Sequence, residues 1–147
     1  MSTVATILSK NKGREIATVT EQDTTLAASQ LMRERHIGSV IVLRGTAVVG
    51  IFTERDVLYR VVANSKDPAQ TRVGEVMTAP VNSCESATSL SDCAQIMTGK
   101  RLRHMPVIDN GELCGVITSG DILAHKVSHL EETNIFLKEY MHGTQVE

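Results

Sequence analysis

Apolar and polar positions along the chain follow an order that occurs twice. Two short segments, 14–19 and 80–84, have strand-like apolar content, and each precedes polar turn residues and a stretch with helical periodicity. Runs rich in Val and Ile then flank a turn, which carries Gly45 in one copy and Asn110-Gly111 in the other. These turns predict a β-hairpin in each copy. A helix follows each hairpin, so we expect the order strand, helix, strand, strand, helix twice.

The inner helix of each copy has one apolar face. These faces consist of Ala28, Leu31 and Met32 in the first copy, and of Leu90, Cys93, Ala94 and Met97 in the second. Ser89 and Asp92 have the spacing of a capping box at the start of the second helix.

A gapless alignment at an offset of 65 residues relates the two copies. It pairs residues 36–58 with 101–123, and five of these 23 pairs are identical. Four of the five lie within GIFTERDVL and GVITSGDIL, which begin at Gly50 and Gly115. Residues paired at this offset are called counterparts below. The repeat predicts an α+β fold built from two pseudo-symmetric β-α-β-β-α units.

The repeat also predicts the division of the chain. We assign residues 7–63 to the first unit and 73–126 to the second. Residues 64–72 are polar, contain a proline and lack periodicity, which is typical of a linker. Residues 127–147 form a C-terminal helical extension and tail.

The last helix, expected over 121–141, has a seam of residues at alternating spacings of four and three. The seam consists of Leu123, Val127, Leu130, Asn134, Leu137 and Met141. This is a heptad pattern with one Asn, a residue that can fix register and dimeric state in coiled coils. Two interpretations stay open, a contact with a second subunit or docking of the helix on its own domain.

Composition excludes several classes of partner. The net charge is −2, and the 15 Lys and Arg residues are scattered, so neither nucleic acid nor an anionic membrane is an expected partner. Aromatic residues make up only 3% of the chain. No apolar run approaches the roughly 20 residues of a membrane span, and the first residues do not resemble a signal peptide. We therefore expect a cytoplasmic protein.

The cysteine and histidine patterns do not predict a metal site. No C-x-x-C is present, and the counterparts of the cysteines are apolar, so we expect Cys84, Cys93 and Cys114 to be buried structural thiols. His125 and His129 are four residues apart on the last helix but lack the Glu of the H-E-x-x-H motif. We interpret them as surface imidazoles.

The repeated Thr-x-x-Asp carries the candidate chemistry. Thr53 with Asp56, and Thr118 with Asp121, have the spacing of a helix N-cap. The same geometry offers backbone N–H groups for a phosphate and a carboxylate for a diol such as ribose. Both interpretations can hold at once.

Five motifs in order resemble those of the cystathionine-β-synthase (CBS) domain, in particular of small stand-alone proteins with two such domains. They are K-G at 12–13, I-G-S at 37–39, G-I-F-T-E-R-D at 50–56, R-L-R-H-M-P-V at 101–107 and G-V-I-T-S-G-D at 115–121. The resemblance covers nearly the whole chain. It implies a CBS pair, or Bateman module, with two clefts between the units that bind adenosine-containing ligands.

The resemblance also implies the site residues of each cleft. One cleft would use Lys12, Gly13, Ile16, Ala17, Thr118, Gly120 and Asp121, and the other Thr53, Arg55, Asp56, Val81 and Asn82. Arg101, Arg103 and His104 are phosphate-binding candidates without an assigned cleft. Asp would hold the ribose hydroxyls. We favour the Asp121 cleft as the occupied one, because Gly120 opens space and Lys12 supplies charge.

The residues favour a regulatory protein over an enzyme. Each copy supplies one carboxylate and one hydroxyl with no His in a fixed register, which gives little support for acid-base or triad chemistry. We expect a homodimer that binds AMP, or else ADP, ATP, NAD(H) or S-adenosylmethionine, and modulates a partner that the sequence does not name. The alternative is a structural dimerisation protein with non-functional clefts.

Overall fold

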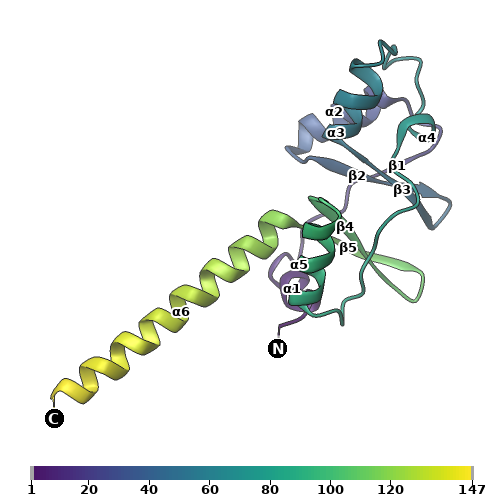
Figure 1. Ribbon diagram of the computed structural model, residues 1–147. Helices are drawn as coiled ribbons and strands as arrows, with labels where there is room; N and C mark the ends of the chain where they lie inside the picture. The colour runs from purple at the N-terminus through teal and green to yellow at the C-terminus, as the bar shows by residue number, and fades with distance from the viewer. Residues whose placement is uncertain (1, 147) are drawn as a thin grey trace.

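The structure, a computed structural model, describes residues 2–146, with side chains described up to Met141. Figure 1 shows two small αβ bodies side by side and one long helix that leaves them. The elements are α1 (Val4–Lys10), β1 (Thr18–Thr20), α2 (Thr25–Arg35), β2 (Ser39–Arg44), β3 (Ala47–Thr53), α3 (Glu54–Asp56), the π-helical η1 (Val57–Val62), α4 (Val73–Val76), α5 (Leu90–Gly99), β4 (His104–Asp109), β5 (Glu112–Thr118) and α6 (Ser119–Val146).

The first unit contains a three-stranded sheet in the order β1-β2-β3. β1 is parallel to β2, and β2 forms an antiparallel hairpin with β3. Ala28 and Met32 of α2 are buried in the core of this unit, as the helical pattern predicts.

The second unit repeats this arrangement with one strand fewer. β4 and β5 form the expected antiparallel hairpin. The strand predicted over 80–84 is wrong, since only Cys84 pairs there, in one parallel bridge to Val107. Its counterpart pair in the first unit is Val19 with Val42.

Both hairpins carry an irregularity at the same place. The register shifts between Val42 and Leu43 in one hairpin and between Val107 and Ile108 in the other. The two sites are counterparts, so the duplication predicted from the sequence extends to the detail of strand pairing.

The two cores exchange their opening helices. Val4 and Ile7 of α1 are buried in the core of the second unit, against α5. Val73 and Val76 of α4 are buried in the core of the first unit. The segment that begins each unit in the sequence therefore packs on the other unit, and this exchange ties the two bodies together.

The segment predicted as a linker is anchored to the first unit. The backbone N–H of Thr25, the first residue of α2, donates to the carbonyl of Thr71 at 2.8 Å. The Thr25 hydroxyl donates to the carbonyl of Pro68 at 3.0 Å. Thr71 itself is buried.

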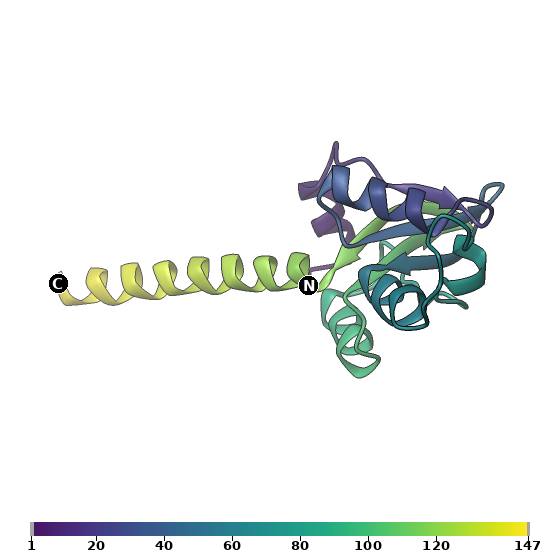
Figure 2. The same ribbon diagram turned by 90° about the horizontal axis from the view of Figure 1, so that it is seen from above.

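The long helix α6 leaves the body after its second turn (Figure 2). His125 is held near Ser2 and Lys10, with its Nδ1 3.1 Å from the Lys10 ammonium. Every described side chain from Lys126 to Met141 is exposed. Docking of this helix on its own domain is therefore wrong for most of its length. In residues 2–146, no helix is both long and apolar enough to cross a membrane.

The cysteines separate into two environments. Cys84 and Cys93 are buried as predicted, and burial raises the pKa of Cys84 to about 12. The prediction for Cys114 is wrong, because this residue is exposed. Its place on β5 directs the thiol outward, within 3.5 Å of a carboxylate oxygen of Asp109.

Candidate functional site

Two cavities lie where the units meet. The larger, of about 730 Å³, includes Thr118 in its lining and is called the Thr118 cleft. The smaller, of about 320 Å³, includes the counterpart Thr53 and is called the Thr53 cleft. Both volumes fall in the range of small-molecule sites, roughly 300–1,000 Å³, so size does not decide which is used.

The Thr-x-x-Asp turns have the same local geometry in both units. The backbone N–H of Asp121 donates to the Thr118 hydroxyl at 3.0 Å, and the Thr118 N–H donates to Asp121 Oδ2 at 3.0 Å. In the other unit, the same two bonds join Asp56 and Thr53 at 3.3 and 3.0 Å. The N-cap interpretation is therefore confirmed in both copies, and it uses one carboxylate oxygen of each Asp.

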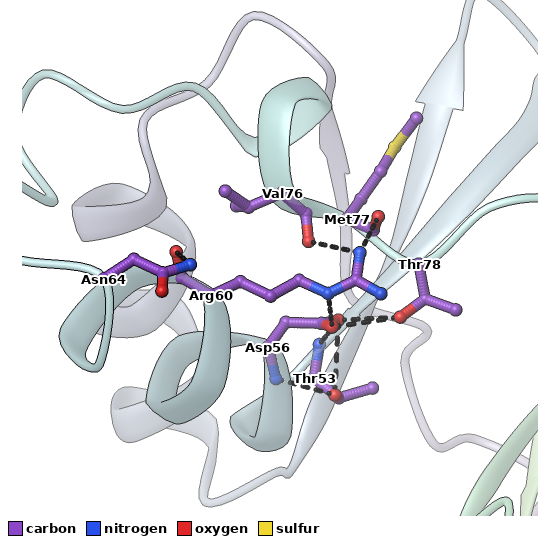
Figure 3. Close-up of polar contacts among 7 residues, drawn as sticks. All are labelled: Thr53, Asp56, Arg60, Asn64, Val76, Met77 and Thr78. Atoms are coloured by element: carbon purple, nitrogen blue, oxygen red, sulfur yellow. Dashed lines mark hydrogen bonds and ion pairs between the residues drawn. The ribbon is translucent and has the colours of Figure 1, made fainter. Parts of the chain in front are cut away.

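The Asp56 carboxylate makes its further polar contacts with two other side chains, Thr78 and Arg60 (Figure 3). The Thr78 hydroxyl lies 3.0 Å from Oδ1 and 3.2 Å from Oδ2, and Arg60 Nε lies 3.5 Å from Oδ1. Arg60 also donates to the carbonyl of Met77 at 2.9 Å, which holds the guanidinium in place. Asp56 is only 4% exposed, so this acid is a buried structural group.

The Asp121 carboxylate has fewer contacts with the described residues. Beyond the cap, its Oδ1 lies 3.5 Å from Arg14 Nη1. The Arg14 side chain is 58% exposed and lines the Thr118 cleft, and its Nη2 donates weakly to Asn11 Oδ1 at 3.4 Å. The ion-pair partner of Asp121 is thus an exposed arginine, and an exposed ion pair of this kind contributes little stability.

The residues before each opening strand account for this difference. Thr78 exchanges backbone hydrogen bonds with Ile51, which holds it beside Asp56. Its counterpart is Gly13, which has no side chain to offer and a φ of +93° that disfavours other residues. Met77 of the same segment packs over Gly50, where a Cβ would lie 2.5 Å from its sulfur, and Leu8 covers the counterpart Gly115 in the same way. The counterpart of Met77 is the exposed Lys12.

Charge is distributed differently in the two clefts. The Thr118 cleft has three basic side chains in its lining, but Arg35 pairs with Glu15 at 3.5 Å. Arg14 pairs with Asp121 at 3.5 Å, and the exposed Lys12 has no ion pair among the described residues. The lining of the Thr53 cleft contains more cations, namely Arg55, Arg60, Lys100, Arg101 and Arg103, against Glu54 and Asp56. Glu54 pairs with Arg103 at 3.7 Å. Both clefts therefore favour anionic ligands.

His104 lies at the boundary and lines both clefts. It packs against Gly38, where an added Cβ would meet its Nε2 at 3.2 Å. Burial lowers the pKa of His104, while Glu54 acts to raise it and Arg103 to lower it further. The neutral imidazole is therefore favoured near neutral pH.

The structure brings together most of the residues predicted for the Thr118 cleft. Lys12, Gly13, Ile16, Ala17 and Thr118 all line it. Gly120 and Asp121 are not in its lining. The Asp121 carboxylate lies beside the cleft, bonded to the lining residue Thr118 and 3.5 Å from the lining residue Arg14. Gly120 lies exposed on the first turn of α6, where a Cβ would only touch Thr118 Oγ1 at 3.6 Å. Among the lining glycines, Gly13 leaves open space, whereas a Cβ on Gly38 would meet His104 and one on Gly115 would meet Leu8.

The predictions for the Thr53 cleft fit less well. Thr53, Arg55 and Asp56 line it, and so do the three unassigned candidates Arg101, Arg103 and His104. Val81 and Asn82 are not in its lining. Asn82 accepts a hydrogen bond from Lys100 at 2.8 Å, which occupies its side-chain oxygen.

Several polar residues of the Thr118 cleft escaped the sequence analysis, and two of them bear on ligand binding. Arg14 follows the K-G motif directly, and its position two residues after Lys12 was the available signal. Asn11 gave no signal, yet its Nδ2 is buried and has no hydrogen-bond partner among the described residues. Buried donors are normally paired, so this one is available to an acceptor in the cleft.

Comparison with known proteins agrees with this arrangement. The family model for the CBS domain matches residues 6–63 and 73–128. The chain belongs to the CBS domain family. Proteins of this family are generally regulatory and bind ligands, and the matches to this chain indicate no catalytic family.

Similar proteins share the two-unit organisation. CBS domain-containing protein YhcV of Bacillus subtilis (strain 168) is 31% identical over 115 residues, which is 78% of this chain and 81% of that protein. A solved structure with CBS domains from Burkholderia ambifaria MC40-6 is 41% identical, with a TM-score of 0.83, and the match covers 86% of this chain and 95% of that one. The hexameric CBS-CP12 protein of bloom-forming cyanobacteria is 29% identical, with a TM-score of 0.73 and coverage of 82% and 70%.

Chemistry other than binding has little support in the described part of the chain. No group of three or more His, Cys, Asp or Glu residues in 2–146 is arranged to hold a metal ion. Asp56 and Asp121 each accept the backbone N–H of the Thr that begins the turn, and no hydrogen bond joins either acid to a histidine among the described residues.

Proposed function

We propose that the protein is a regulatory module that binds an adenosine-containing ligand in the Thr118 cleft and has no catalytic activity of its own. AMP is the favoured ligand, with ADP, ATP, NAD(H) and S-adenosylmethionine as the other members of the class. The observation that carries the proposal is the difference between two equivalent acids. Asp56 is saturated by Thr78 and Arg60, whereas Asp121 keeps one oxygen opposite an exposed arginine.

The ribose of the ligand binds the carboxylate of Asp121 in this account. Two vicinal hydroxyls donate to the carboxylate of Asp121 when Arg14 turns away from it. Arg14 and Lys12 then meet the phosphate. This exchange keeps the guanidinium paired, because it leaves one anion for another, while the carboxylate accepts hydrogen bonds from the neutral hydroxyls in its place.

The base of the ligand lies against the opening segment of the first unit. Ile16 and the buried Ala17 supply one apolar wall, and Leu8, which packs against Gly115, supplies a further apolar surface of the cavity. The unpaired Asn11 Nδ2 supplies a donor in the same cavity. Its pairing by the ligand would satisfy the polar group that the protein leaves unsatisfied.

The Thr53 cleft has a different role in this account. Its carboxylate is committed to the fold, so the ribose contact is lost there, while its cations remain. We infer that it attracts phosphate groups weakly and does not select a nucleoside.

The proposed output is regulation of another protein. α6 begins at the Thr118 turn, so a ligand that contacts Asp121 touches the first turn of the projecting helix. We also propose that the protein is cytoplasmic and forms homodimers. The alternative, a structural dimerisation protein with non-functional clefts, is favoured by the exposed apolar residues of α6.

A ligand panel separates these two functions. Melting temperature is measured with AMP, ADP, ATP, NAD(H), S-adenosylmethionine and adenosine, with GMP as the matched control. A ligand that binds the folded state stabilises it by about 2.7 kcal/mol at 100 times its Kd. At least one adenosine compound should raise the melting temperature, and GMP should raise it less. No shift with any compound, followed by no heat of binding in titration calorimetry, would leave the structural alternative.

A further inference from the structure

Helix α6 carries an apolar seam that none of the described residues covers. The six seam residues Leu123, Val127, Leu130, Asn134, Leu137 and Met141 are all exposed, Leu130 by 64% and Leu123 by 63%. The match to the CBS domain ends at residue 128, so most of this seam lies beyond it. A continuous line of exposed apolar side chains on a helix, such as this one, marks an interaction site.

The seam has the composition of a two-stranded coiled coil. Its spacings place Val127, Asn134 and Met141 at heptad position a. Three leucines, Leu123, Leu130 and Leu137, take position d. A β-branched residue at a with leucine at d favours two parallel strands. The seam from 123 to 141 spans about 27 Å at 1.5 Å per residue.

Asn134 selects the partner. In a parallel pair in register, residues at a face their own copies, so the two Asn134 amides donate to each other. Against an apolar residue, each amide would be buried without a partner, which costs about 1–3 kcal/mol. A second copy of this chain supplies the matching amide at the right height.

The flanking charges agree with the same pairing. Lys126 is at position g and Glu131 at the following e. In a parallel pair, Lys126 of each helix reaches Glu131 of the other, which gives two symmetric ion pairs across the seam. An antiparallel pair that overlaps the same six residues places Asn134 against Leu130 and brings the two Glu131 side chains together. Both changes disfavour it.

We propose that residues 123–141 form a parallel, in-register, two-stranded coiled coil with a second copy of this chain. The seam starts two residues after Asp121, so the pairing places the two Thr118 clefts at the same end of the coil. The contact does not require that the clefts bind a ligand. Failure of this contact and failure of the proposed ligand binding are therefore separate results.

Stoichiometry is tested on the full chain by light scattering coupled to size exclusion. The wild type should have twice the chain mass of 16.0 kDa. Leu130→Glu should give a monomer, because it places two charges in the seam. Phe136→Glu is the matched control, since Phe136 is equally exposed, 66%, but lies at heptad position c, off the seam. It should remain dimeric, and equal melting temperatures of the ligand-binding body would show that both variants fold.

Orientation is tested by a disulfide between copies. Met141→Cys, in a Cys114→Ser background to remove the exposed native thiol, should cross-link under mild oxidation. In a parallel pair these residues face each other, whereas in the antiparallel pair they lie about 27 Å apart. A monomeric wild type, an assembly of more than two chains, a Leu130→Glu variant with unchanged mass, or a dimer that fails to cross-link would each overturn the proposal.

Discussion

The two Thr-x-x-Asp turns have nearly the same backbone geometry and differ in what surrounds the acid. Asp56 is buried, accepts from Thr78 and contacts the half-exposed Arg60, while Asp121 has the exposed Arg14 as its further contact among the described residues. In both cases the partner comes from the opening segment of the other unit, since Thr78 follows Asp56 by 22 residues and Arg14 precedes Asp121 by 107. The segment packed against each copy of the motif therefore decides which groups contact its acid.

The comparison also shows how two clefts differ without a change in their motif. Thr78 and Met77 occupy the positions that Gly13 and Lys12 occupy in the other copy. Thr78 donates to the acid and Met77 packs over Gly50, whereas Gly13 leaves open space and Lys12 supplies a cation. These two positions contribute to the difference that we propose between the clefts.

The largest effect is expected from Asp121→Asn. The neutral amide keeps an oxygen for the helix cap but loses the charge-assisted bonds from the ribose, each about 1.5–3 kcal/mol. AMP affinity in titration calorimetry should fall about 30-fold to 100-fold, with a melting temperature close to that of the wild type. An unchanged affinity would remove Asp121 from the site.

Asp56→Asn should lower stability and leave AMP affinity nearly unchanged, the reverse of Asp121→Asn. It weakens buried bonds to Thr78 and Arg60, so the free energy of unfolding in urea should drop by about 2–3 kcal/mol. AMP affinity should stay within about twofold of the wild type, provided the measurement is made well below the melting temperature. Loss of binding in this variant together with full stability would reverse the roles of the two acids.

Arg14→Ala distinguishes the contribution of the phosphate to binding from that of the nucleoside. AMP affinity should fall about fivefold to tenfold, in the range of one charge-assisted hydrogen bond. Adenosine affinity should not fall, because the substitution also removes a competitor for Asp121. Lys66→Ala, a change at an exposed cation in the linker, is the control. Equal losses for AMP and adenosine would contradict the proposed exchange.

A weaker effect tests the cations of the Thr53 cleft. In the Asp121→Asn variant, residual binding of ATP should be displaced by pyrophosphate and should weaken as salt rises from 50 to 300 mM, since exposed charges are screened. Residual binding that is insensitive to both would indicate nucleoside recognition in that cleft.

The smallest effect concerns pH. Burial lowers the pKa of His104 in the folded protein, so between that value and the unfolded value the unfolded chain binds more protons. Stability from this residue is complete above the unfolded pKa of about 6.5 and is lost as pH falls through the folded pKa. His104→Gln should reduce the drop in melting temperature between pH 7 and 5, by at most a few degrees. An identical pH profile would contradict the assigned burial.

The repeat made much of the fold predictable. Both hairpins and both Thr-Asp caps follow from local signals, namely turn residues such as Asn110-Gly111 and the spacing of the caps. The resemblance to the CBS domain then predicted Lys12, Gly13, Ile16 and Ala17 in the lining of the Thr118 cleft. These features depend on short-range sequence, which a single chain records well.

Features that depend on packing between the units were not predictable. α1 has no strong periodic signal, and its burial in the other unit's core is decided by the exchange of opening helices. The saturation of Asp56 by Thr78 depends on a bridge to Ile51, which no local pattern announces. Cys114 was misjudged because its apolar counterpart, Val49, is half-buried rather than buried.

The most direct test of the account is a crystal structure of the full chain grown with saturating AMP. We expect one nucleotide per chain, with its ribose hydroxyls on Asp121, its phosphate on Lys12 and Arg14, and Asp56 still bonded to Thr78. A nucleotide whose ribose lies on Asp56, or a Thr118 cleft with Arg14 still on Asp121 and no nucleotide beside it, would contradict the claim that only one of the two acids is free to bind.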